Sequence, residues 1–303
     1  MGAVIIKKVV IILIPFVYLI ILSLNLYNSK VEIKNLKTTL NNEIITNEEL
    51  HTTSSNLKLS IVELEIKIAD LNKTIDILVD KTKESKPIAS NQIKPGEKEA
   101  YLTFDDGPSE NTSKILKILK DNDISATFFV NGHSGYDDVY KSIINQGSII
   151  GNHTYSHDYK TIYSSVSAYN EDVEKLNSFL EGIGIPRPTL MRFPGGSNNT
   201  ISNNYGGNDL MNKLTKEQIT NGYQYIDWNI TSGDSDKITE SKDVILENVL
   251  KGAKGMESIV ILFHDSTPKT TTVEALPIII KNLKELGYVF KTLSINSPVI
   301  HFK

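Results

Sequence analysis

The sequence has no cysteine among its 303 residues. This absence excludes disulfide bonds, zinc sites with cysteine ligands and catalysis by a thiol. Histidine is scarce too, with six in the whole chain, so an imidazole beside a predicted strand end is informative. From Glu99 to Lys303 there are 19 Lys and Arg against 25 Asp and Glu, and no basic tract. This balance argues against nucleic acid as a partner.

A hydrophobic run without any charge extends from Val9 to Leu24, and Lys7 and Lys8 precede it. With the residues before the lysines, the apolar region has about the length that a membrane span needs. No small-x-small cleavage pattern follows the run, which favours an uncleaved anchor over a signal peptide. We therefore predict a cytoplasmic tip and single transmembrane anchor over residues 1–29, in the cell membrane, with the remainder of the chain extracellular.

Ile and Leu then recur at heptad spacing over residues 30–79. From Leu57 to Leu78 every a and d position is apolar, and Asn47 occupies an a position. Ile at a with Leu at d favours a parallel two-stranded coiled coil, so we predict a stalk that forms a homodimer. The alternative is one amphipathic helix packed on its own domain. Residues 80–98 are rich in Lys, Glu, Ser, Pro and Asn and indicate a linker.

The remaining residues, 99–303, alternate between short apolar runs and helix-like segments. The predicted strands are Ala100–Phe104, Ala126–Val130, Ser148–Gly151, Thr189–Phe193, Tyr225–Ile230, Ser258–Phe263 and Val289–Leu293. The predicted helices are Asn111–Asp121, Asp137–Gln146, Tyr169–Gly182, Thr215–Asn221, Lys242–Ala253 and Val273–Leu286. This alternation predicts an α/β fold with a mainly parallel sheet, either a barrel or an open doubly wound sheet.

Polar residues follow five of the predicted strands. They are Asp105-Asp106, Asn152 to His157, Arg192 to Gly196, Thr231 to Asp234, and His264-Asp265. In parallel α/β folds the functional groups lie at the C-terminal ends of the strands. We therefore expect all of these side chains to meet on one rim of the sheet.

Two neighbouring carboxylates, Asp105 and Asp106, end the first predicted strand. Taken alone, they could form an acidic turn, since Asp-Gly is a common turn pair. Two like charges at one place, however, are costly to desolvate unless a cation lies beside them. His153 and His157 are four residues apart, so a helical turn would place both on one side. Two imidazoles and one carboxylate make a divalent-metal site with open positions.

His264 follows an apolar run and is well placed as a general acid at neutral pH. It needs a carboxylate to hold its tautomer and raise its pKa, and Asp234 and Asp227 are the two candidates. We interpret Asp265 as a helix N-cap or turn residue. His133 could line the rim. The other histidines, His51 and His301, are interpreted as structural or solvent-exposed.

Together these motifs resemble the polysaccharide deacetylase family, also called the NodB homology domain or carbohydrate esterase family 4. The family's T-F-D-D-G is present as Thr103–Gly107, and its H-[ST]-x-x-H as His153–His157. Its R-x-P-x-G corresponds to Arg192–Gly196, and its L-x-H to Leu262–His264. The resemblance runs from Glu99 to Leu293, about two-thirds of the chain, and implies a distorted (β/α) barrel of about seven parallel strands.

The resemblance also implies roles for these residues. Asp106, His153 and His157 would bind a divalent metal, most often zinc, with Co²⁺, Ni²⁺, Mn²⁺ or Fe²⁺ as alternatives. Asp105 would be the general base and His264 the acid that protonates the departing amine.

Further positions follow from the same resemblance. Arg192 would orient Asp105 through a bidentate contact. A backbone N–H just after Asp105 or in the turn Pro194-Gly195-Gly196 would stabilise the oxyanion.

One motif departs from the family pattern. Asp234 aligns with the Asp that supports the catalytic histidine, but Ser235 stands where Trp is common. The wall of the acetyl pocket is therefore assigned to Trp228 or Leu262. Asp234 is preferred over Asp227 as the partner of His264, because Asp227 precedes Trp228 inside the predicted strand.

An anchored, outward-facing deacetylase points to the cell envelope, where peptidoglycan lies within reach of a short tether. The predicted substrate is therefore an acetylated glycan, with the N-acetylglucosamine of peptidoglycan preferred. Other N- or O-acetylated extracellular glycans are the alternative within the same class. The alternative from another class is a non-catalytic glycan-binding scaffold on the envelope.

Overall fold

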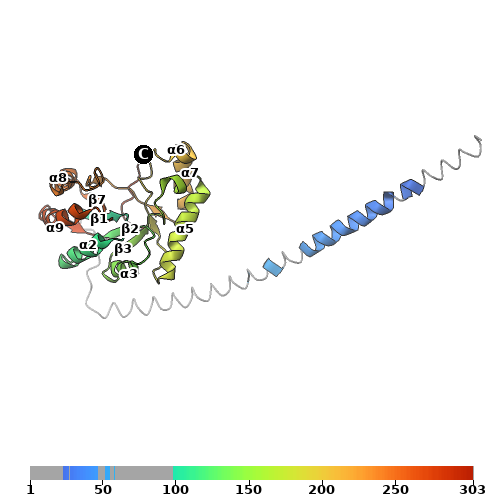
Figure 1. Ribbon diagram of the computed structural model, residues 1–303, viewed down its shortest axis with the longest axis horizontal. Helices are drawn as coiled ribbons and strands as arrows, with labels where there is room; N and C mark the ends of the chain where they lie inside the picture. The colour runs from blue at the N-terminus through green and yellow to red at the C-terminus, as the bar shows by residue number, and fades with distance from the viewer. Residues whose placement is uncertain (1–22, 27, 47–51, 55–57, 59–97, 303) are drawn as a thin grey trace, which may run out of the picture. The chain divides into compact units, whose positions relative to one another are not determined.

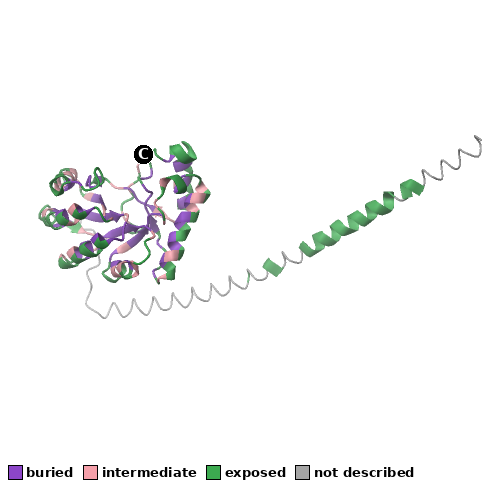
Figure 2. Ribbon diagram, viewed as in Figure 1, coloured by how far each residue is buried: buried purple, intermediate pink, exposed green. Residues whose placement is uncertain are grey.

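The computed structural model describes residues 23–26, 28–46, 52–54, 58 and 98–302, and the chain divides into two compact units, Met1–Gln92 and Ile93–Lys303 (Figure 1). In the first unit the described residues are helical and exposed (Figure 2). Ile33, Leu36 and Leu40, three of the apolar heptad positions, are each more than half exposed.

The predicted transmembrane run and linker lie almost wholly outside the described residues, as do residues 57–78 of the predicted stalk except residue 58. None of the helices formed by the described residues is long and apolar enough to cross a membrane. The anchor and the coiled coil therefore stay predictions.

The second unit is built on a parallel sheet. Its strands are β1 (Lys98–Asp105), β2 (Thr127–Val130), β3 (Ile149–Asn152), β4 (Leu190–Met191), β5 (Gln224–Tyr225), β6 (Ile230–Thr231), β7 (Ser258–His264) and β8 (Tyr288–Phe290). Seven of them follow the order β5-β4-β3-β2-β1-β7-β6, and all pairs are parallel. This is the order of strands around a barrel, opened between β5 and β6. A distorted half-barrel is therefore present, and the doubly wound alternative is excluded.

The eighth strand, β8, pairs with the first strand, β1. β7 pairs with β1 from Glu99 to Asp105 and so occupies one edge of that strand. On the other edge, β2 pairs with Thr103–Asp105 and β8 with Lys98–Ala100. The two short strands thus share one edge of β1, which gives the longest strand of the sheet a partner on both sides.

Helices lie around the outside of the sheet (Figure 1). They are α2 (Glu110–Asp121), α3 (Asp137–Asn145), α4 (Tyr159–Ile162), α5 (Val166–Gly182), α6 (Asn203–Gly206), α7 (Leu210–Thr220), α8 (Lys242–Ala253) and α9 (Thr270–Glu285). Side-chain caps define several of their starts, because an Ncap oxygen satisfies an N–H that lacks a helical acceptor. Ser109 and Thr112 form a capping box at α2, and Ser165 and Ser241 cap α5 and α8.

Successive side chains of β1 belong to two different hydrophobic clusters. Leu102 and Phe104 belong to the large cluster between sheet and helices, while Tyr101 belongs to a small cluster inside the barrel. Because successive side chains in a strand point to opposite faces, Thr103 and Asp105 lie on the inner face with Tyr101. Most strand residues are buried, with Thr231 of β6 and Val289 of β8 as exposed exceptions, whereas the longer helices are buried on one side (Figure 2).

The predicted strand Tyr225–Ile230 is wrong as a single element. The structure divides it into β5, which pairs with β4, and β6, which pairs with β7 at the other edge of the sheet. Residues 226–229 cross the gap in the barrel between them, so Trp228 lies outside any strand. Two short helices, α4 and α6, were also missed, because a four-residue helix carries too little apolar periodicity to show in the sequence.

Candidate active site

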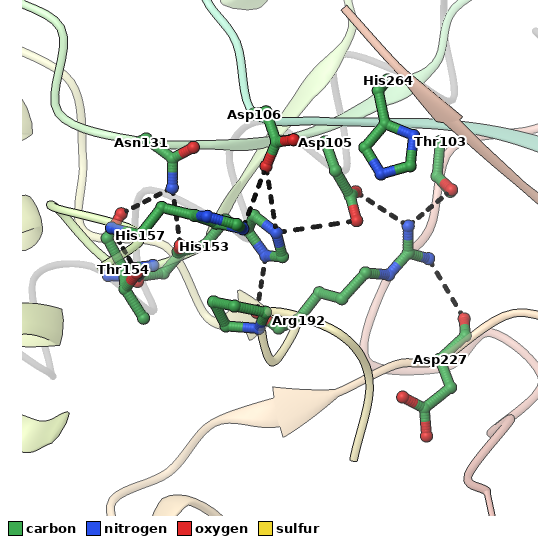
Figure 3. A network of polar contacts seen from close by, with 12 residues as sticks. Thr103, Asp105, Asp106, Asn131, His153, Thr154, His157, Arg192, Asp227 and His264 are labelled. Carbon is green, nitrogen blue, oxygen red and sulfur yellow. Dashed lines mark hydrogen bonds and ion pairs between the residues drawn. The ribbon is translucent and has the colours of Figure 1, made fainter. Parts of the chain in front are cut away.

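The polar residues predicted to share a rim do so. Asp105 ends β1 and His264 ends β7, and the two are register partners on adjacent strands. The histidine loop follows β3, Arg192 follows β4, and Asp234 follows β6. Figure 3 shows Asp105, Asp106 and the imidazoles of the histidine loop converging from these separate strand ends.

The two adjacent aspartates point to different neighbours. Asp105 is still in the strand and is almost fully buried on the inner face of the barrel. Asp106 has a φ of 74°, in the left-handed region that non-glycine residues rarely adopt. This turn carries its carboxylate away from Asp105 and toward His153 and His157 (Figure 3). Strained backbone of this kind is typical of functional sites.

The loop from His153 to His157 is not the helical turn that the four-residue spacing suggested. Thr154 and His157 are left-handed, with φ of 66° and 52°, so the chain folds back within five residues. Asn131 fixes this shape by donating hydrogen bonds from Nδ2 to the carbonyl oxygens of His153 and Thr154, at 2.7 and 3.0 Å. Asp172 Oδ1 accepts from the next two backbone N–H groups, at 2.6 and 2.8 Å.

Three ligand atoms gather at the centre of the site. Asp106 Oδ1 lies 3.5 Å from His153 Nε2 and 3.2 Å from His157 Nε2, and ligand atoms of the three residues lie within 4.8 Å of one another. Bonds of about 2.0–2.2 Å to a metal place neighbouring ligand atoms about 3.0–3.5 Å apart. Asp106 Oδ1 is buried and has no hydrogen-bond partner among the described residues. A carboxylate oxygen in this position fits a cation, so the residues present suit a divalent metal.

Neighbouring groups influence the protonation and orientation of Asp106, His153 and His157. Burial would raise the pKa of Asp106, but the two histidines hold the pKa of this carboxyl well below its usual range. Burial lowers the pKa of His157, which favours the neutral imidazole that binds metals. His153 Nδ1 lies 2.7 Å from the carbonyl oxygen of Arg192, and this contact leaves Nε2 facing Asp106. A backbone partner of this kind fixes the tautomer of a metal-ligating histidine.

Arg192 is fully buried beneath Asp105. Its Nη1 donates to Asp105 Oδ1 at 2.9 Å and to Thr103 Oγ1 at 2.7 Å. Its Nε and Nη2 donate to the carbonyl oxygens of Ile226 and Asp227. The predicted bidentate contact is therefore wrong: one guanidinium nitrogen holds Asp105, and the others hold the segment that crosses the barrel gap.

The structure places Asp234 against His264. Asp234 Oδ1 lies 2.7 Å from His264 Nδ1, and Oδ2 accepts from the His264 backbone N–H and from Thr272 Oγ1. Burial alone would lower the pKa of His264, but the hydrogen bond and the charge of Asp234 raise it to about 9. The imidazole is thus held protonated at neutral pH, with Nε2 free to face the site.

Asp227 has a different role. Its carboxylate accepts hydrogen bonds from the N–H and hydroxyl of Ser197 and from the N–H of Phe302. Figure 3 shows this carboxylate pointing away from the Arg192 guanidinium, while only its carbonyl oxygen accepts from that side chain. Asp227 therefore ties the turn after Arg192 to the C-terminal segment and does not contact His264.

Most of the predicted substrate-contacting residues lie at the turn after Arg192 or beside it, whereas Leu262 lies in β7. Pro194 and Gly196 are buried, whereas Gly195 between them is exposed. Trp228 packs edge-on against Phe302, with ring centroids 4.8 Å apart, and lies beside Gly196.

Leu262 is buried in β7, two residues before His264. Because alternate residues of a strand share a face, Leu262 lies on the same face as His264 and as Val260, which belongs to the cluster inside the barrel. Leu262 therefore lies one step deeper in the barrel than His264.

Asp265 is not the turn or cap residue that we expected, since Lys269 is the Ncap of α9. It is fully buried, it accepts from Thr112 Oγ1 at 2.5 Å, and its Oδ1 has no hydrogen-bond partner. Burial raises the pKa of Asp265 to about 7. A Cβ at Gly107 would lie 2.2 Å from its Oδ2, which explains why glycine follows the two aspartates.

Comparisons with known proteins point in one direction. Residues 92–218 match the family profile described as "Polysaccharide deacetylase". A peptidoglycan-N-acetylglucosamine deacetylase of Bacillus cereus is 34% identical over 200 residues, covering 64% of this chain and 68% of the relative. The catalytic domain of peptidoglycan N-acetylglucosamine deacetylase from Eubacterium rectale is similar in structure, with a TM-score of 0.66 at 34% identity, covering 71% of this chain and 97% of that one. A CE4 esterase from Streptococcus mutans has a TM-score of 0.57 at 28% identity, covering 65% and 87%.

Proposed function

The chain belongs to the polysaccharide deacetylase family, and from that premise we propose that it removes N-acetyl groups from the N-acetylglucosamine of peptidoglycan. The reaction is hydrolysis: water adds to the amide carbonyl, the C–N bond breaks, and acetate and a free sugar amine leave. One observation carries the proposal. Asp105 and the His264–Asp234 pair face each other on adjacent strand ends, beside the Asp-His-His cluster.

Asp105 is placed to act as the base. Arg192 engages its Oδ1, and its Oδ2 lies 3.7 Å from His153 Nε2, on the side of the cluster. The guanidinium contact fixes the direction of this carboxylate, so Oδ2 can orient the attacking water and take its proton.

Asp106, His153 and His157 would hold the divalent ion, and we propose zinc, which imidazole and carboxylate ligands suit. When bound, such an ion supplies Lewis acidity that lowers the pKa of water and polarises a carbonyl group. The two adjacent carboxylates thus have separate tasks: Asp106 would bind the ion, and Asp105 would accept the proton.

His264 is placed to act as the acid. Because its pKa is raised to about 9, the imidazolium persists at neutral pH and can protonate the departing amine nitrogen. Asp234 accepts from Nδ1 and so presents the Nε2 proton to the substrate. Base and acid come from adjacent strand ends, so one acetyl group could reach both.

The choice of peptidoglycan rests on two supports. The relatives from Bacillus cereus and Eubacterium rectale are peptidoglycan N-acetylglucosamine deacetylases. The sequence also predicts a membrane anchor and a coiled-coil stalk, which would hold the catalytic unit outside the cell membrane as a parallel dimer within reach of the wall.

The resemblance to the Streptococcus mutans CE4 esterase favours a second candidate, an acetylated glycan other than peptidoglycan, including O-acetyl esters. Metal-assisted attack on an acetyl carbonyl serves amides and esters alike. A glycan-binding scaffold without catalysis is the candidate from another class.

Acetate release by the purified chain tests these candidates, with peptidoglycan, N-acetylglucosamine oligomers and O-acetylated xylan as substrates. We expect release from peptidoglycan and the oligomers, loss on chelation, and recovery with Zn²⁺. Asp105→Asn should lose at least about 10²-fold in kcat while retaining the metal, since it removes the base. Asp209→Asn, at an exposed surface ion pair, is the matched control. Activity that survives chelation contradicts the mechanism, and binding without acetate release supports the scaffold.

A further inference from the structure

The turn after Arg192 has an open position at Gly195. Its neighbours Pro194 and Gly196 are buried, but Gly195 is exposed and has a φ of +79°. A Cβ built on Gly195 would lie 2.6 Å from the hydroxyl oxygen of Tyr159. The phenol of Tyr159 therefore occupies the space that a side chain at position 195 would fill. Gly195 is exposed, and Tyr159 is partly buried beside it.

Tyr159 comes from α4, directly after the histidine loop, and its ring packs edge-on against His157 with centroids 5.4 Å apart. Tyr163, one turn later, packs against Tyr159 at 5.5 Å. Both hydroxyls thus reach the same turn. The Tyr163 hydroxyl donates to the carbonyl oxygen of Pro194 at 2.7 Å and has a structural task.

The Tyr159 hydroxyl, by contrast, has no hydrogen-bond acceptor among residues 98–302. The Gly195 N–H likewise has none in that part of the chain. Two of the backbone N–H groups that the sequence suggested for the oxyanion are already engaged, since Asp106 N–H donates to Phe129 O and Gly196 N–H to Phe193 O, which leaves the Gly195 N–H. The Tyr159 hydroxyl and the Gly195 N–H are therefore both available as donors. Tyr159 also contacts His157, a proposed metal ligand.

We propose that Tyr159 is a catalytic residue whose hydroxyl donates a hydrogen bond to the acyl oxygen as negative charge develops on it. The inference rests on the proposed deacetylation. The ion that His157 would hold would polarise the acyl oxygen, and Tyr159 contacts that imidazole. The phenol donates this hydrogen bond and keeps its proton throughout the reaction. A donor aimed at charge that develops during reaction accelerates the chemical step more than it strengthens substrate binding.

The first test compares Tyr159→Phe with Tyr205→Phe in the full chain loaded with Zn²⁺. Tyr205 lies in α6, is exposed and serves as the matched loss of one hydroxyl. We expect Tyr159→Phe to lose about 10²-fold in kcat, as the removal of one oxyanion donor does, with KM, metal content and melting temperature unchanged. Tyr205→Phe should match wild type. Wild-type kcat in Tyr159→Phe overturns the inference, and so does a loss confined to KM.

A double-mutant cycle with Gly195→Ala gives a second test. In wild type the new methyl collides with the Tyr159 hydroxyl oxygen and displaces it, whereas without that oxygen the next ring atom is 3.5 Å away. We expect Gly195→Ala to lower kcat strongly in wild type and much less in Tyr159→Phe. Additive losses in kcat overturn the inference.

The same assays separate this inference from the proposed substrate. If wild type releases acetate only from another acetylated glycan, peptidoglycan is rejected as the substrate. The comparison of Tyr159→Phe with Tyr205→Phe is then made on that other glycan. If wild type releases acetate from none of them, the catalytic role of Tyr159 fails with the proposed function.

Discussion

Five buried or partly buried aspartates around the rim share one chemistry and have different environments. Asp105 is held by an arginine, Asp106 by two imidazoles, and Asp234 by an imidazole and a backbone N–H. The Asp227 carboxylate accepts from Ser197 and the C-terminal segment, and Asp265 is enclosed below Gly107. Neighbours set the charge and direction of each carboxylate, so residue type alone does not reveal its task.

The His264–Asp234 pair predicts a pH dependence. His264 must be protonated to act as the acid, so the wild-type rate should fall as pH rises through about 9. Asp234→Asn removes the charge that raises this pKa, and burial then lowers it. The alkaline limb should therefore move to lower pH by at least one pH unit, with a lower kcat at pH 8. Rate profiles between pH 5 and pH 10 measure the shift, and an unmoved limb contradicts the assignment.

Arg192 predicts a large effect on stability. Removal of one partner from a buried ion pair leaves an uncompensated charge and costs about 3–5 kcal/mol. We expect Arg192→Met to lower the free energy of unfolding by that amount in urea, because both Arg192 and Asp105 are almost fully buried. Arg187→Met removes a pair with Glu174 that is closer, at 2.6 Å against 2.9 Å, but both side chains are about half exposed. Its cost should stay below about 1 kcal/mol. Equal costs would show that burial does not govern the Arg192 pair.

At the scale of elements, the site depends on where strands stop. β1 ends at Asp105, and the left-handed Asp106 then redirects the chain. Gly107 lets the Asp265 carboxyl pack directly beneath this turn. The end of β7 supplies that carboxyl, so the two longest strands of the sheet support each other's C-terminal ends.

Gly107→Ala should disturb this support. The new methyl would meet three atoms of the buried Asp265 carboxyl at 2.2–2.6 Å, and a buried group has little room to move. Overpacking of this kind costs about 1–3 kcal/mol, and we expect weaker Zn²⁺ binding as well, because Asp106 is the adjacent residue. Gly182→Ala is the control, since nothing lies within 4 Å of its Cβ. It should be neutral or stabilising by up to about 1 kcal/mol. Urea unfolding and zinc titration check both variants.

At the scale of the whole catalytic unit, a chain segment and not a pair of hydrogen-bonded strands spans the gap in the barrel. β5 and β6 do not pair, and residues 226–229 cross between them. The C-terminal segment runs alongside: Asp227 N–H donates to Ile300 O, and its carboxylate accepts from Phe302 N–H. Arg192 holds the same crossing from inside the barrel.

Asp227→Asn should loosen this closure without changing the acid. One side-chain oxygen is replaced by an amide, so at least one of the donors from Ser197 and Phe302 loses its acceptor. The expected cost is about 1–3 kcal/mol in the free energy of unfolding. The alkaline limb of the rate should stay at the wild-type pH, in contrast to Asp234→Asn. A limb that moved as it does in Asp234→Asn would contradict the separation of the two aspartates.

The sequence by itself determined the α/β alternation and four motifs that carry the chemistry. It could do so because strand and helix periodicity and short motifs are local properties of the chain. Asp106, His153 and His157 were identified as a ligand cluster because their motifs match those of the family. Some features left no local signal, among them the split of residues 225–230, the left-handed turn at Asp106 and the free hydroxyl of Tyr159.

Other features depend on partners far away in the sequence, so the folded arrangement sets them. Asp234 rather than Asp227 meets His264 because β6 pairs with β7, while the chain before β6 is drawn across the barrel gap by Arg192. Asp265 follows a strand and resembles a turn residue, but the packing of β7 against Gly107 buries it. Strand pairing fixes which side chains face one another, and pairing is settled by the whole sheet.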